Sequence, residues 1–327
     1  MTFSVLVLGS NSAIPTLTRN PSAHLLNASE RLFLIDCAEG TQLQLRRYHV
    51  HFQRIRHIFI SHLHGDHFYG LIGLLTSFHL LGRKEELHLY GPLELWHILR
   101  IQLDASQTRL IYPVMFHELT GDGRTGDQKT SRGKQDPGSN GRKQIPGTNL
   151  LYEDDLLTIH SFPLLHSIPT WGFLFREKLQ PRKIRKEILN RLTIPNEWMN
   201  RIKNGEDYVD EEGKNYANRE LTLDPPKPRS YAYCTDTAYT ETIVPVIRSV
   251  DLLYHEATFM NDMAESAREK YHSTAAEAAA IAKSAGVKKL IIGHFSARYD
   301  DLGPLLEEAR VVFPETELAD DGRVFSV

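Results

Sequence analysis

Histidine and aspartate are concentrated in one short stretch, "FISHLHGDHFYG", which spans residues 59–70. Within it His62, His64, Asp66 and His67 form the pattern H-x-H-x-D-H. Imidazole and carboxylate are good zinc ligands, and four of them exceed what one catalytic zinc needs from a single loop. The pattern therefore predicts a site for two metal ions about 3.5–4 Å apart, as in dinuclear hydrolases.

The elements that position this loop can be read from its flanks. The run "IRHIFI", residues 55–60, is short, apolar and rich in β-branched residues, which predicts a buried strand that ends at the loop. Two metals need more ligands, and these should follow other strands to the same edge of a sheet. Three residues follow apolar runs in this way: His166, Asp236 and His294. His160 lies inside an alternating strand, and we interpret it as packed or solvated.

Strand-like and helix-like runs alternate in two strand-rich halves of the chain. This arrangement predicts an α/β fold in which sheets pack face to face with helices outside. The Ala-rich run "STAAEAAAIAKSAG" predicts a helix with Ser273 or Thr274 as its N-cap and Gly286 as its C-cap. Across 327 residues, 41% are hydrophobic and 24% are charged, enough to bury a large core.

Charge and cysteine content indicate which partners and which cellular compartment the protein has. The net charge of -3 gives no bulk attraction for nucleic acid, so any basic surface must be local. The two cysteines cannot form a disulfide framework and suggest a reducing compartment. The N-terminus has no signal-peptide pattern, and no apolar run approaches the ~18 residues of a transmembrane helix. We expect a cytoplasmic protein without a membrane partner.

Two segments depart from the alternation. Residues 120–149 hold seven glycines and one large apolar residue, which predicts a mobile low-complexity insertion in a surface loop. Residues 176–203 carry nine Lys/Arg against three Glu. The apolar residues of this second segment predict one stripe of an amphipathic helix, namely Ile184, Ile188, Leu189 and Leu192. Its charge excess is typical either of a solvated face or of a surface for an anionic partner.

The motif H-x-H-x-D-H followed by "GL" resembles the metallo-β-lactamase fold, a four-layer αβ/βα sandwich. Over nearly the whole chain the sequence is more closely similar to ribonuclease Z, a family of endonucleases that remove the 3′ trailer from tRNA precursors. The stretches that carry this resemblance are "LGSNSAIP", "NPSAHLL", "FLIDCAEGTQLQL", "LYGP", "CTDT", "HEATF", "YHSTAAEAA" and "HFSARY". The "HEAT" and "HST" elements are specific to this group among hydrolases of the fold.

The resemblance assigns roles to these residues. It implies one zinc held by His62, His64 and His166, and a second held by Asp66, His67 and His294. Asp236 would bridge the two ions, and Asp66 would also act as the general base. His272 of "YHST" would protonate the leaving oxygen, with Glu256 of "HEAT" orienting it. Manganese is an alternative to zinc, because imidazole and carboxylate accept both metals.

The resemblance also implies how the substrate is bound. The whole chain, residues 1–327, would form a single domain with a protruding basic arm at residues 176–225. The basic residues expected to contact precursor tRNA are Arg182, Lys183, Arg185 and Lys186. The family's arm has a Gly-Pro-containing tip, whereas this chain has "IPNEWMN" at that place. Family members are typically homodimers, and we expect the same here.

Two other classes of function fit parts of the sequence. A metallohydrolase of the same fold could act on a small phosphodiester or a lactone. A non-catalytic scaffold could use the basic arm to bind RNA. The "HEAT" and "YHST" elements and the arm favour the endonuclease over the first alternative. The full set of metal ligands favours it over the second.

Overall fold

The computed structural model describes residues 2–120, 125–126 and 145–327. The chain divides into two compact units. The first comprises residues 1–152, 159–175 and 230–327, and the second comprises residues 153–158 and 176–229. Most of the predicted insertion at 120–149 lies outside the described residues, so its predicted mobility stays a prediction.

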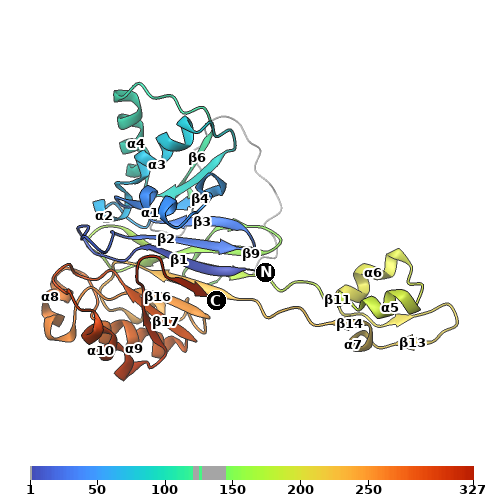
Figure 1. Cartoon of the computed structure of the whole chain (residues 1–327). Coiled ribbons are helices and arrows are strands. Elements are labelled where there is room, and N and C mark those ends of the chain that lie inside the picture. Colours follow the sequence, from blue (N-terminus) through green and yellow to red (C-terminus); the bar gives the residue numbers. More distant parts are fainter. Residues whose placement is uncertain (1, 121–124, 127–144) are drawn as a thin grey trace. The chain divides into compact units, whose positions relative to one another are not determined.

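The first unit is built on two sheets (Figure 1). In spatial order, one contains β19 (Val324–Ser326), β1 (Phe3–Gly9), β2 (Ala23–Ala28), β3 (Arg31–Ile35), β4 (Ile55–Phe59), β5 (Leu87–Gly91), β6 (Val114–Leu119) and β7 (Thr125–Gly126). The other contains β18 (Thr316–Leu318), β17 (Lys289–Gly293), β16 (Leu252–Glu256), β15 (Ser230–Cys234), β10 (Thr170–Glu177), β9 (Leu157–Leu164) and β8 (Asn149–Glu153). Neighbours β3 to β6 run parallel, as do neighbours β15 to β18.

Helices cover the outer faces of both sheets (Figure 1). Helices on the first sheet are α1 (Thr41–Arg47), α3 (Leu71–Leu80) and α4 (Leu93–Ala105), and the short α2 (Gly65–Phe68) lies between α1 and α3 in the chain. Their buried leucines pack against Ile58 and Ile60 of the sheet. On the other side, α9 (Ala275–Ala285) and α10 (Gly303–Val312) pack on the second sheet, and α8 (Ala264–Glu269) precedes them.

An aromatic layer fills the space between the sheets. Phe59 of β4 lies 5.4 Å from Phe173 and 5.8 Å from Phe175 of β10, measured between ring centroids. All three side chains are fully buried. Because side chains alternate across a strand, β4 sends Ile58 to the helices and Phe59 to the opposing sheet. This helix–sheet–sheet–helix order confirms the predicted four-layer sandwich.

The predicted helix at 275–285 is confirmed, including its caps. Thr274 is the N-cap, and its side chain and that of Glu277 form a reciprocal capping box. Gly286 ends the helix with φ 62°, a left-handed conformation that glycine adopts without strain. No helix in the described part of the chain has the length and apolar character needed to cross a lipid bilayer.

The second unit has a small core of its own. It contains β11 (Lys183–Ile184), α5 (Lys186–Arg191), α6 (Asn196–Lys203), β12 (Tyr208–Val209), β13 (Asn215–Tyr216), α7 (Asn218–Leu221) and β14 (Thr222–Leu223). The buried residues at its centre are Ile194, Ile202, Tyr208 and Leu221. Strands β11 and β14 pair antiparallel, as do β12 and β13.

The prediction of a single helical stripe over residues 184–192 is wrong. Ile184 lies in β11, where pairing with β14 holds the chain extended. Leu192 ends α5 with φ -122° and ψ 129°. Ile188 and Leu192 pack on the small core, whereas 46% of Leu189 is exposed. Contacts distant in sequence therefore override the local helical spacing here.

Candidate metal centre

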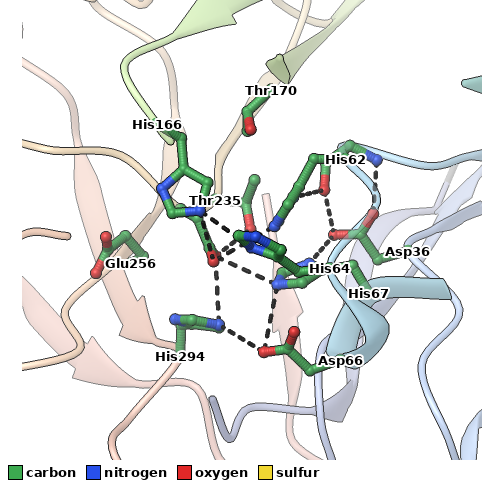
Figure 2. Close-up of polar contacts among 12 residues, drawn as sticks. Asp36, His62, His64, Asp66, His67, His166, Thr170, Thr235, Glu256 and His294 are labelled. Carbon is green, nitrogen blue, oxygen red and sulfur yellow. Dashed lines mark hydrogen bonds and ion pairs between the residues drawn. The ribbon is translucent and has the colours of Figure 1, made fainter. Parts of the chain in front are cut away.

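The predicted ligands meet at the carboxyl ends of strands in the first unit (Figure 2). His62 and His64 follow β4, and Asp66 and His67 lie in α2 directly after them. Asp236 follows β15, and His294 follows β17. Parallel strands place their carboxyl ends at one edge of a sheet, so residues distant in sequence come together there.

One cluster contains His62, His64, His166 and Asp236, with one ligand atom from each within 4.8 Å of the others. His166 follows β9, and its Nδ1 donates to the Tyr271 carbonyl at 2.9 Å. That hydrogen bond turns Nε2 of His166 toward the cluster, where it lies 3.2 Å from Nδ1 of His64. An imidazole held through one nitrogen presents the other to a metal.

A second cluster contains Asp66, His67 and His294. Oδ2 of Asp66 lies 3.7 Å from Nε2 of His67 and 3.4 Å from Nε2 of His294. The same carboxylate oxygen accepts a hydrogen bond from the backbone N–H of Ala13 at 2.6 Å. The backbone of His294 has φ 61°, a left-handed conformation that is uncommon for residues other than glycine.

Asp236 lies between the two clusters and faces both. Its Oδ2 lies 3.5 Å from Nε2 of His62 and 3.8 Å from Nε2 of His166. Its Oδ1 lies 3.3 Å from Nε2 of His67 and 3.2 Å from Nε2 of His294. One carboxylate oxygen per cluster is the arrangement that a bridging ligand needs.

The donor set fits metal ions better than it fits a hydrogen-bonded network. Nε2 of His62 and Nε2 of His67 are buried and have no hydrogen-bond partner among the described residues. Buried polar atoms are rarely left without a partner in native structures. Both nitrogens face carboxylate oxygens at more than 3.2 Å, with other imidazole nitrogens nearby. Convergent imidazole and carboxylate donors can hold a zinc-type ion.

The pKa values of the cluster reflect the same crowding. Burial lowers the pKa of His62 to about 4. Burial also opposes protonation of His67, but Asp236, Asp66 and Asp36 together raise its pKa well above the usual range. Burial works against ionisation of Asp236 too, and His294, His67 and His62 hold its pKa well below the usual value. The ionised Asp236 and the unprotonated His62 are thus available to a cation, whereas His67 has to release its proton to bind one.

Asp36 supports this centre and was not among the predicted site residues. Its Oδ2 accepts from Nδ1 of His67 at 2.8 Å, from the Tyr233 hydroxyl at 2.8 Å and from the Ser61 hydroxyl at 2.9 Å. Its Oδ1 accepts from the Ser61 backbone N–H at 2.8 Å. The carboxylate thereby fixes the ring of His67 with Nε2 toward the centre. Asp36 follows the apolar strand β3, so the strand-end rule could have identified it.

His272 and Glu256 form a pair beside the clusters. Nδ1 of His272 lies 2.9 Å from Oε1 of Glu256, the last residue of β16. Burial would lower the pKa of His272, but the adjacent Glu256 carboxylate outweighs burial and raises that pKa to about 9. His272 also belongs to a third group of convergent ligand atoms, with Asp236 and His294. A protonated imidazole here can donate a proton to a substrate.

The centre opens into a cavity of about 500 Å³. Asp66, Asp236 and His272 line it, and so does the loop from Ser12 to Pro15. A chain segment of a polymeric substrate can therefore reach both the clusters and the His272–Glu256 pair.

Several other histidines lie outside the centre. His160 is buried in β9, and its Nδ1 lies 3.1 Å from the Thr148 hydroxyl. A larger cavity of about 710 Å³ is lined by His57, His88 and His117, which lie within strands β4, β5 and β6 and not in the loops that follow them. Its charged lining is balanced, with three arginines and three glutamates. We assign it no role in the chemistry.

Both cysteines are free and buried, and Cys234 packs in the apolar core beneath α9. Burial raises the pKa of Cys37 to about 12, which keeps it an unreactive thiol. Neither belongs to the ligand groups of the described residues.

Comparison with known proteins decides the family. Residues 3–110 match the sequence profile of a family described as Anti-Pycsar protein Apyc1, which covers only the first part of the chain. Over its full length the chain is 44% identical to ribonuclease Z of Bacteroides fragilis, across 325 residues and 99% of each protein. It is also 44% identical to ribonuclease Z of Phocaeicola vulgatus, over 97% of this chain and 95% of that protein. The chain belongs to the ribonuclease Z family.

Solved structures agree with this membership. The short form of human tRNase Z is 28% identical and superposes with a TM-score of 0.68, covering 99% of both chains. YhfI from Bacillus subtilis, a metallo-β-lactamase fold protein, gives a TM-score of 0.65 at 18% identity over 100% of both chains. The first likeness supports the ribonuclease Z assignment, and the second shows the fold.

The contact between Asp36 and His67 yields a prediction. Asp36→Asn should weaken metal retention about 10–100-fold, because partners that orient a metal-binding histidine typically contribute that much to affinity. Metal content after dialysis against graded chelator concentrations measures the effect. Asp104→Asn, an exposed acid on α4, serves as the control. Unchanged metal retention in Asp36→Asn would show that Asp36 does not set the orientation of His67.

Proposed function

We propose that this chain is a metal-dependent endoribonuclease that removes the 3′ trailer from precursor tRNA. The observation that carries the proposal is the pairing of two ligand clusters with the His272–Glu256 pair around one cavity. Full-length identity of 44% to ribonuclease Z proteins supports it. A lactonase or a binding scaffold would not require a buried acid pair beside the ligand clusters.

Two zinc ions per chain are proposed as the cofactor, with manganese as the alternative metal. His62, His64 and His166 would hold one ion, and Asp66, His67 and His294 the other, with Asp236 between them. Such ions supply an activated water and neutralise charge on the phosphoryl oxygens. The two-sided contacts of Asp236 support this division.

Side chains of the protein then accept and donate the protons of the reaction. Water attacks phosphorus, a new P–O bond forms, and the bond to the leaving oxygen breaks. Asp66 accepts the proton that the water gives up, and its Oδ2 is held in place by the Ala13 N–H. His272 donates a proton to the leaving oxygen while Glu256 holds Nδ1 of its ring. An acid and a base on separate side chains suit this general acid–base division.

The second unit is proposed as the RNA-binding arm, at residues 176–225. Of its four predicted contact residues, two have structural partners. Nε of Arg182 donates to the Thr222 hydroxyl at 2.7 Å, and Arg182 also pairs with Asp224. Nε of Arg185 donates to the Thr222 carbonyl at 3.1 Å. Lys183 and Lys186 are exposed and have no ion pair among the described residues, which leaves their charges available to phosphates.

A homodimer in the cytoplasm completes the proposal. The dimer rests on the resemblance to the family. The location is supported by the RNA substrate and by two free cysteines, which suit a reducing compartment.

Metal content tests the dinuclear site. Elemental analysis should find close to two ions per chain in the purified protein. His64→Ala should retain about one, because His64 contacts one cluster only, whereas Asp236→Ala should lose both, because it contacts both. A wild-type protein that saturates at one ion would contradict the site.

The role of His272 as an acid can be isolated by changing the leaving group. His272→Asn should lower turnover of precursor tRNA about 10²–10⁴-fold, since its leaving alkoxide needs a proton. Turnover of bis(p-nitrophenyl) phosphate should fall much less, because nitrophenolate leaves without one. Metal content should stay near two ions. Equal losses on both substrates would refute the acid role, and loss of metal would identify His272 as a ligand.

The arm is tested by its two free lysines. Lys183→Ser together with Lys186→Ser should raise the KM for precursor tRNA and flatten its salt dependence by about one unit of log–log slope per lysine. Hydrolysis of bis(p-nitrophenyl) phosphate should not change. The matched control is Lys84→Ser with Lys283→Ser, two exposed lysines of the first unit. Equal KM values for the two double variants would leave the basic segment as a solvated face.

A further inference from the structure

The hydroxyl of Thr258 lies where the metal centre meets the acid pair. Its Oγ1 is 2.9 Å from Nδ1 of His294, 2.8 Å from Oε2 of Glu256 and 3.3 Å from Nδ1 of His272. Thr258 is 3% exposed. One small polar group thus contacts a proposed metal ligand, the proposed acid and the carboxylate that orients that acid.

Glu256 can act only as an acceptor in this arrangement. Its Oε1 accepts from the backbone N–H groups of Thr237 at 3.1 Å and Ser273 at 2.9 Å, besides the His272 ring. Its Oε2 accepts from the Thr258 backbone N–H at 2.9 Å. Each oxygen therefore faces N–H donors, and a proton on either one would oppose a donor.

The donor count then fixes the direction of the remaining bonds. A hydroxyl has one hydrogen, and that of Thr258 must go to Oε2 of Glu256. Oγ1 is left with lone pairs alone toward His294, so Nδ1 of His294 must carry the hydrogen. The unprotonated Nε2 of His294 then faces Asp66 and Asp236 at 3.4 and 3.2 Å. This is the tautomer that can bind a metal through Nε2.

The backbone holds Thr258 at this junction from both sides. Its carbonyl accepts from the Ser296 N–H at 3.2 Å, two residues beyond His294. The next residue, Phe259, donates a backbone hydrogen bond to Ser273 and accepts one from Ala275, and both of these residues closely follow His272 in the chain. A β-branched side chain on a fixed backbone has few χ1 choices, so its hydroxyl is held in one place.

We infer that Thr258 is a positioning residue that sets the tautomer of His294 and joins the metal centre to the His272–Glu256 pair. The bonds run from His294 through the Thr258 hydroxyl to Glu256, which also receives His272. A change at the metal ligand is thereby transmitted to the carboxylate that orients the acid. This inference deepens the proposed function and rests on it for the role of His272.

The test uses two substitutions that differ by a single hydroxyl. Thr258→Ser keeps the hydroxyl and loses the methyl, whereas Thr258→Ala loses both. The full-length holoenzymes are dialysed against graded concentrations of a chelator, and the zinc remaining per chain is measured. Thr258→Ala should release one ion at about 10–100-fold weaker affinity than wild type, the range found when such supporting partners are removed. Thr258→Ser should stay within about threefold of wild type.

Kinetics on precursor tRNA supply the second readout. Thr258→Ala should lower kcat with KM nearly unchanged, because the partners of the hydroxyl are His294, Glu256 and His272, and none of these is assigned to RNA binding. Thr258→Val also removes the hydroxyl but keeps nearly the same side-chain shape, and it should lower kcat in the same way. The control Thr316→Val changes a buried threonine on β18, an edge strand of the same sheet, and measures the general cost of this substitution.

The outcomes separate this inference from the proposed function. Equal zinc retention by the Ser and Ala variants, both at the wild-type level, would overturn the role of Thr258. Equal weakening in both would assign the effect to the methyl group and overturn it too. Zinc retention requires no substrate, so the role of Thr258 at His294 remains testable if the wild-type protein fails to cleave precursor tRNA. If the wild-type protein cleaves precursor tRNA and the Thr258 variants match it in zinc retention and kcat, the proposed function stands and the role of Thr258 is overturned.

Discussion

The structure depends on burying the negative charge of carboxylates beside imidazole rings. Asp36, Asp66 and Asp236 all act on His67, and two of them lie within 4 Å of its Nε2. Bringing carboxylates out of water costs several kcal/mol per ion in real proteins unless counter-charges compensate. Protonation of His67 compensates in part when metal is absent. Divalent cations held by the two clusters would compensate more fully, and their binding free energy would then contribute to folding.

Strand register determines which residues meet at this point. In the second sheet Cys234 pairs with His255, and His255 pairs with Ile292. Asp236 and His294 each lie two residues past this level, and Glu256 lies one past it. The loops that leave three adjacent parallel strands therefore begin at the same height. The proposed ligands span the chain from residue 62 to residue 294. The paired residues Cys234, His255 and Ile292 nevertheless bring the loops after β15, β16 and β17 together.

The sequence was sufficient for residues whose position follows a local rule. The residues that do so follow apolar strands of the two sheets, and the loops after these strands meet: His62 to His67, His166, Asp236 and His294. Asp36 obeys the same rule but forms no recognisable ligand motif, so its role became clear only from its contact with His67. Thr258 depends on distances to side chains 14 and 36 residues away, which no local pattern encodes. The stripe at 184–192 failed for a related reason, because β11 pairs with a strand about 40 residues later.

The basic residues from Arg182 to Lys186 fall into two groups, those that hold the fold of the second unit and those whose charges stay exposed. Arg182 and Arg185 alternate with Lys183 and Lys186 in sequence, yet their guanidinium groups bind Thr222 and so join β11 to β14. Arginine suits this role because its planar group donates several directed hydrogen bonds. The lysines next to them have no ion pair among the described residues, and their exposed charges would suit exchangeable contacts with phosphate. Counting positive charge along the sequence therefore overestimates the surface available to RNA, and the hydrogen bonds of the arm separate the residues that fold it from those free to bind.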